Sequence, residues 1–148
     1  MEINGLPLHP LVVHAAVVFG PLAVLSALAY VAVPRLHDRL RWPTLVLVLI
    51  GLVSIWAAYL TGDNFFESDR FANVSGEALE RIEHHEDLAG TLRWVTTGFA
   101  VVAVVALWQH QRRGAVRYAL GALVAALAIA TLVYTVLTGD AGSKAVWG

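Results

Sequence analysis

Four long apolar runs limit this chain to one kind of architecture. They cover about residues 11–33, 44–61, 91–109 and 118–138. Each run approaches the roughly 20 residues that a helix needs to cross a hydrocarbon core about 30 Å thick. Only 14% of the residues are charged, against about 25% in an average soluble domain. The sequence therefore predicts an all-α, integral membrane four-helix bundle that forms a single transmembrane domain over residues 1–148.

Charge and cysteine content exclude several classes of function. The formal net charge is −1, so no basic stripe is available to neutralise the phosphates of a nucleic acid. The chain has no cysteine, which excludes disulfides, thiolate metal sites, iron–sulfur clusters and haem attached through a C-x-x-C-H motif. Any metal must be held by histidine, carboxylate, methionine or backbone groups.

The segments between the runs predict the orientation of the bundle. The first link has three arginines against one aspartate and the third has three arginines, whereas residues 62–90 hold eight acidic residues against two arginines. Because basic links favour the cytoplasmic side, we expect both termini and the acidic segment 62–90 to lie outside a bacterial cytoplasmic (inner) membrane. Tryptophans support this: Trp42 and Trp108 would mark the inner interface, and Trp56, Trp94 and Trp147 the outer one.

An internal repeat relates the two halves of the chain. Leu-Thr-Gly-Asp occurs at residues 60–63 and again at 137–140, an offset of 77 residues. A shift of 76 residues places His9 on His85. Because both halves start and end on the same side, we expect two parallel αα repeats related by a pseudo-twofold axis along the membrane normal.

The repeated motif itself has two interpretations. As an ordinary helix end, it would put Gly62 and Gly139 in the left-handed C′ position that glycine adopts cheaply. Asp63 and Asp140 would then lie beside the negative end of a helix dipole, which is mildly unfavourable. Each carboxylate could instead orient an outer-face histidine that binds a metal. A simple solvated aspartate at a turn remains equally compatible with the sequence.

Four of the six histidines fall at the predicted outer end, and helix geometry separates their roles. His9 would lie near the start of the first helix, with His14 deeper and about 140° further round. The third helix should begin near Ser75, well outside the membrane, and its apolar stripe places His85 towards the bundle with His84 at the edge. We therefore expect His14 and His85 to form the inward pair, with His9 and His84 as the alternative ligands.

The other two histidines, His37 and His110, lie in the basic links. We interpret them as solvated loop residues without a functional role.

The chain resembles the small bacterial four-helix membrane proteins catalogued as domain of unknown function 2231. The resemblance rests on the opening Gly-Leu-Pro-Leu-His-Pro-Leu-Val-Val-His and the closing Thr-Gly-Asp-Ala-Gly-Ser-Lys, and it covers essentially the whole chain. The family's His-Pro-x-x-Val-His segment fits residues 9–14, and its further histidine ahead of the third span fits His84 or His85. Ala15 and Ala16 stand where many members have Phe-Pro. Fusions of some members to cytochrome c-like or rubredoxin-like modules imply redox work.

Three hypotheses of function follow. The first is a haem b-binding protein of electron transfer with His14 and His85, or alternatively His9 and His84, as axial ligands. The candidate partners of the haem propionates are Arg93, Trp94, Tyr59 and Tyr134. The second is a copper, zinc or iron site formed by these histidines with carboxylates such as Asp63, Asp140 or Glu86. The third is a transporter, sensor or assembly subunit with a pH-responsive histidine cluster.

No motif of hydrolytic chemistry occurs, so a redox or binding subunit fits the chain better than an independent enzyme. The expected partners are the lipid bilayer and, at the outer face, a redox protein or another membrane subunit. A homo-oligomer is also compatible with the sequence.

Overall fold

The structure of the chain is a computed structural model, and it describes residues 2–3, 6–66 and 74–148. Its helices are α1 (Leu8–Ala32), the short 3₁₀ helix η1 (Pro34–Leu36), α2 (His37–Phe66), α3 (Glu77–Trp108) and α4 (Ala115–Trp147). Two strands of two residues each, β1 (Glu2–Ile3) and β2 (Leu6–Pro7), pair in antiparallel fashion ahead of α1. The prediction of an all-α four-helix membrane bundle is confirmed.

All four α-helices are long and apolar enough to cross a membrane. They contain 25, 30, 32 and 33 residues, which corresponds to about 38–50 Å of helix at 1.5 Å per residue. This exceeds a hydrocarbon core of about 30 Å, so every helix has a part that extends beyond the core. The third helix begins at Glu77, close to the predicted start.

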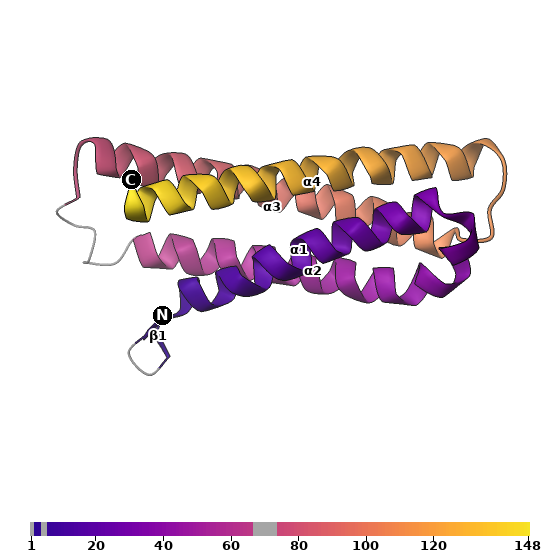
Figure 1. Cartoon of the computed structure of the whole chain (residues 1–148), viewed down its shortest axis with the longest axis horizontal. Helices are drawn as coiled ribbons and strands as arrows, with labels where there is room; N and C mark the ends of the chain where they lie inside the picture. Colours follow the sequence, from indigo (N-terminus) through magenta and orange to yellow (C-terminus); the bar gives the residue numbers. More distant parts are fainter. Residues whose placement is uncertain (1, 4–5, 67–73) are drawn as a thin grey trace.

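The two halves pack as antiparallel helix pairs, α1 on α2 and α3 on α4, and the pairs meet through α2 with α3 and α1 with α4 (Figure 1). Both termini lie at the same end of the bundle (Figure 1). We call this the terminal end. The opposite end, where the links carry Arg35, Arg39, Arg112 and Arg113, is the basic end.

Small residues form the centre of the bundle. The largest buried cluster consists of Ala23, Val24, Ala27, Val48, Phe99, Ala100, Ala103, Val124 and Ala128. Alanines at helix contacts let the backbones approach closely, which is how membrane helices associate without a strong hydrophobic driving force. Large apolar side chains such as Leu25 and Val53 are exposed on the outside of the bundle, where lipid can cover them.

The predicted helix ends at Gly62 and Gly139 are wrong. Both glycines lie inside helices, because α2 continues to Phe66 and α4 to Trp147. Among the described residues, the glycines with positive φ are Gly76 and Gly114, which precede α3 and α4. Beyond Gly139, the Asp140–Lys144 ion pair at 2.7 Å joins successive turns of α4.

Candidate cofactor site

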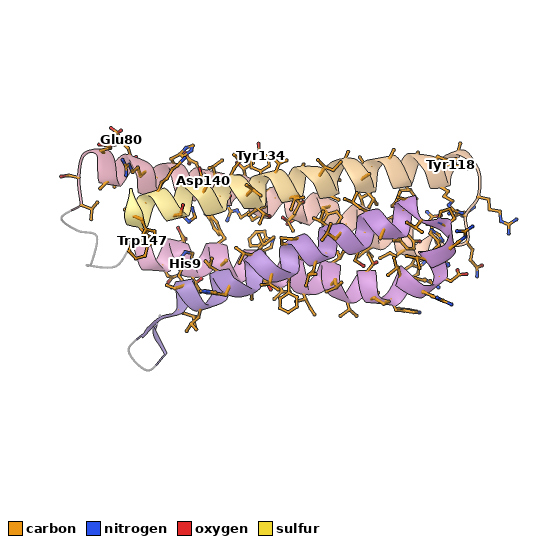
Figure 2. All side chains as sticks on the ribbon, in the orientation of Figure 1. His9, Glu80, Tyr118, Tyr134, Asp140 and Trp147 are labelled. Atoms are coloured by element: carbon orange, nitrogen blue, oxygen red, sulfur yellow. The ribbon has the colours of Figure 1, made fainter. Side chains whose placement is uncertain are left out.

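His9 and His85, the histidines that the repeat equates, lie next to each other at the terminal end. His9 is in the first turn of α1 and His85 is in α3. Their ring centroids are 6.5 Å apart and the ring planes are inclined by 70°. Figure 2 shows His9, Asp140 and Trp147 toward this end and Tyr118 at the other end. The pseudo-twofold relation thus brings equivalent imidazoles together.

Each imidazole is anchored to the second helix of its own half. Nδ1 of His9 donates to the carbonyl oxygen of Ala58 in α2 at 3.0 Å. Nδ1 of His85 donates to the carbonyl oxygen of Thr138 in α4 at 2.9 Å. Because a carbonyl can only accept, Nδ1 carries a proton in both rings, and the unprotonated nitrogen of the neutral imidazole is Nε2. Such anchoring fixes the tautomer and the orientation of a metal-binding histidine.

Glycines make room for both rings. A Cβ atom at Gly62 would lie 2.9 Å from Cε1 of His9, and one at Gly142 would lie 2.9 Å from Cε1 of His85. At Gly139 a Cβ atom would meet nothing within 4 Å. The functional counterpart of Gly62 is therefore Gly142, one helical turn beyond the glycine that the Leu-Thr-Gly-Asp motif suggests. In each half the accepting carbonyl lies four residues before the contact glycine.

A cavity of about 420 Å³ adjoins the two imidazoles and is lined by all four α-helices. Ala16, Ile55 and Leu92 form a buried apolar cluster that lines it, and Tyr134 packs against this cluster. The polar residues of the lining include Asp63, Glu86 and Thr138. The size is within the range of about 300–1,000 Å³ that is typical of small-molecule sites, which are also mainly apolar.

The other two predicted ligands lie differently. His14 is exposed, and its Nδ1 donates to the carbonyl oxygen of Pro10 in its own helix at 2.6 Å, although the residue also lines the cavity. The structure therefore brings His9 next to His85, whereas His14, expected to form the inward pair with His85, bonds its own helix. The reason is helix phase: with His9 turned towards α2, a residue about 140° further round turns outward. His84 is exposed at the edge of α3.

Backbone carbonyls, in place of the predicted carboxylates, accept from Nδ1 of His9 and of His85. Asp140 instead forms the ion pair with Lys144, and both side chains are largely exposed. Asp63 lines the cavity.

Arg93 lies in a nest of aromatic rings on the α2–α3 side of the cavity. Its guanidinium carbon is 3.8 Å from the ring centroid of Tyr59, 5.3 Å from that of Trp56 and 5.5 Å from that of Trp94. Its Nε atom is buried and has no hydrogen-bond partner among the described residues. Arg93 and Trp94 line a hollow of about 530 Å³ that shares Tyr59 and Glu86 with the cavity.

The interpretation of His37 and His110 as solvated loop residues is wrong. Their rings stack at a centroid distance of 4.5 Å, and the ring of the buried Tyr30 stacks on His37 at 4.2 Å. The Tyr30 hydroxyl donates to Nδ1 of His110 at 3.0 Å, and Nε2 of His110 donates to Oδ1 of Asp38 at 2.7 Å. The sequence does indicate that these two histidines are equivalent, since each follows the first apolar run of its half.

The bundle and its paired histidines define a small multi-pass α-helical membrane protein with a candidate cofactor cavity at one end. The chain belongs to the family described as predicted membrane protein (DUF2231), whose sequence profile matches residues 5–148. This confirms the resemblance drawn from the sequence. No curated protein matches the chain, and no solved structure matches it.

Proposed function

We propose that this protein binds haem b at the terminal end, with His9 and His85 as the axial ligands, and that it transfers electrons. The observation that carries the proposal is the pair of anchored imidazoles from the two halves, which lie next to each other beside an apolar cavity. Histidine is a common axial ligand of haem iron, and four-helix bundles build such sites from inward-facing side chains.

The spacing of the two rings suits one ion between them. At metal–nitrogen distances of about 2 Å, two imidazoles on opposite sides of an ion have ring centroids about 6 to 6.5 Å apart. The observed separation is 6.5 Å. Because the protons of both rings are on Nδ1, the Nε2 atoms can act as ligands without a change of tautomer.

The number of protein ligands favours haem over a bare copper, zinc or iron ion. Zinc sites generally have four ligands, at least three of them from the protein. In the described part of the chain, His9 and His85 belong to no group of three His, Asp or Glu donors within 4.8 Å. A porphyrin supplies four nitrogen donors of its own, so two imidazoles are sufficient. The bare-ion alternative is therefore not proposed at this end.

Arg93 is the residue that we propose for a haem propionate. Its buried Nε lacks a hydrogen-bond partner among the described residues, and a carboxylate would satisfy it with a charge-assisted hydrogen bond. Tyr59 both contacts the guanidinium and lines the cavity. Trp94 is mostly exposed and Tyr134 packs at the apolar lining, so we expect them to contribute surface and packing.

Haem iron would supply a one-electron couple, and the protein would determine its use. Haem held by one imidazole from each half would favour electron transfer over oxygen chemistry. The apolar residues around the cavity would exclude water and, with the axial ligands, set the reduction potential. A redox partner would approach the terminal end, where the cavity lies.

The test is the absorption spectrum of the full chain purified in detergent after expression with ample haem. We expect a red protein with a Soret band and the electron paramagnetic resonance signal of six-coordinate, low-spin iron. His9→Ala and His85→Ala should lose haem or become high-spin, whereas His14→Ala and His84→Ala should not. A colourless protein would refute haem binding. If His14→Ala changes the spectrum and His9→Ala does not, the ligand assignment is wrong.

The proposed orientation places the terminal end outside the bacterial inner membrane, because the basic links favour the cytoplasm. The absence of cysteine makes this simple to test. Ser143 and Gln111 are exposed at the terminal and basic ends respectively. In intact spheroplasts, a membrane-impermeant maleimide should label Ser143→Cys and spare Gln111→Cys; the opposite pattern would reverse the orientation.

A further inference from the structure

The basic end carries a second cluster of ligand-type side chains that the proposed haem site does not use. His37 and Asp38 lie at the start of α2, and His110 follows α3 in the other half. One ligand atom from each of these three residues lies within 4.8 Å of the others. In the described part of the chain, these three side chains form a group close enough to share one ion.

We propose that His37, Asp38 and His110 bind a divalent transition-metal ion of the zinc class. Imidazole and carboxylate are ligands that suit zinc, copper, nickel and iron. Three protein ligands leave one position for water, as in open zinc sites. Asp38 is 93% exposed and the side chain of His110 only 10%, so an ion would enter from solvent and be held against the end of the bundle.

Haem does not fit this cluster, because the two imidazoles stack face to face at 4.5 Å. This is shorter than the separation of about 6 Å that two rings on opposite sides of an ion require. The three ligand atoms would therefore approach a bare ion from the same side. The two ends of the bundle thus differ in the kind of ligand that they can accept.

Tyr30 is a positioning residue for this site. It is 4% exposed, and its hydroxyl donates to Nδ1 of His110. When Nε2 of His110 binds an ion, the proton of Nε2 moves to Nδ1, and the tyrosine oxygen then accepts from Nδ1–H. The ring remains neutral and keeps its partner. Such partners orient metal-binding histidines, and their loss commonly weakens affinity 10- to 100-fold.

Positive charges around the cluster oppose a cation and provide a specific control. Arg35 in η1 and Arg39 in the first turn of α2 are exposed, where solvent and salt screen them. Arg117 of α4 is close enough to act electrostatically on His37 and on Tyr30. Removing the charge of Arg117 should therefore tighten cation binding, an effect that a merely structural cluster would not produce.

The test is calorimetric titration of Zn²⁺ into the untagged, haem-free full chain in detergent, with Co²⁺ absorption as a second measure of ligand number. We expect one ion bound by the wild type and a loss of affinity greater than tenfold in Asp38→Asn, His37→Gln and His110→Gln. Asp38→Asn is the decisive variant, because so exposed a side chain can change without loss of the fold.

Three further variants complete the design. Tyr30→Phe should weaken binding, Arg117→Gln should strengthen it, and a His9→Ala/His85→Ala double variant should leave it unchanged, which separates this site from the proposed haem site. Equal Zn²⁺ affinity in Asp38→Asn, His110→Gln and the wild type would overturn the proposal. So would loss of the ion in the double variant alone.

Discussion

Gly62→Ala and Gly142→Ala are the substitutions that most directly test how the histidines are held. Each added methyl carbon would be 2.9 Å from Cε1 of the imidazole above it, whereas contacting carbon atoms prefer about 3.5–4.0 Å. The ring must therefore withdraw by about 0.6–1 Å. That movement weakens the hydrogen bond from His9 to Ala58 in the first variant, and from His85 to Thr138 in the second.

The effect on stability should be small because two terms oppose each other. Alanine in place of glycine inside a helix stabilises by about 0.5–1 kcal/mol. Loss of one hydrogen bond costs about 0.5–1.5 kcal/mol. We therefore expect unfolding free energies of Gly62→Ala and Gly142→Ala to stay within about 1 kcal/mol of the wild type. The affinity for haem should fall about 10- to 100-fold, as when the partner of a metal-binding histidine is lost.

The assay is haem titration followed by absorption, with thermal unfolding of the haem-free protein alongside. Gly139→Ala is the matched control, because its Cβ atom would meet nothing within 4 Å. It should stabilise the helix by about 0.5–1 kcal/mol and leave haem affinity unchanged. The reasoning is refuted if Gly139→Ala impairs binding as much as Gly142→Ala, or if Gly62→Ala and Gly142→Ala bind haem like the wild type.

Two other predictions concern Arg93 and the core threonines. Arg93→Leu should weaken haem retention and lower the reduction potential, because a positive charge near the haem favours the reduced form; potentiometric titration measures this, and Arg113→Leu at the basic end should have no such effect. Thr131→Val should stabilise the bundle by about 1 kcal/mol, because the hydroxyl of this buried residue has no partner in the described structure. Thr135→Val should destabilise by a similar amount, because that hydroxyl donates to the carbonyl of Thr131 at 2.8 Å; unfolding curves that rank the two variants the other way would contradict both expectations.

Hydropathy and the repeat predict the architecture because each is a pattern that extends over many residues. Four apolar runs fix the number of helices, and the shared position of His9 and His85 predicts that these residues are equivalent. The sequence predicts the ends of the helices less well. Gly62 and Gly139 look alike as helix ends in the sequence, but a glycine inside a helix can also serve a close contact, and only the packing of His9 and His85 distinguishes the two uses.

The placement of the candidate histidines depends on contacts that local sequence does not encode. Five residues separate His9 from His14, so helix phase predicts that they diverge, but which of them faces α2 follows from the packing of α1. His37 and His110 fall in polar, arginine-rich links that indicate solvent. Their stacking depends on the approach of two distant links and on Tyr30, a residue within an apolar run.

The two histidine pairs differ in where their hydrogen bonds go. One pair bonds residues of its own half, and the other pair includes a histidine that bonds residues of the other half. At the terminal end, His9 and His85 each bond the second helix of their own half, which holds the rings with their centroids 6.5 Å apart beside a cavity. At the basic end, His110 bonds Tyr30 and Asp38 of the other half. Those bonds draw the halves together and bring His110 onto His37. Bonds within a half thus leave a cavity beside the two rings at the terminal end, and bonds between the halves hold the two rings in contact at the basic end. A substitution that breaks the contacts of His110 should therefore loosen the basic end without changing how His9 and His85 are anchored.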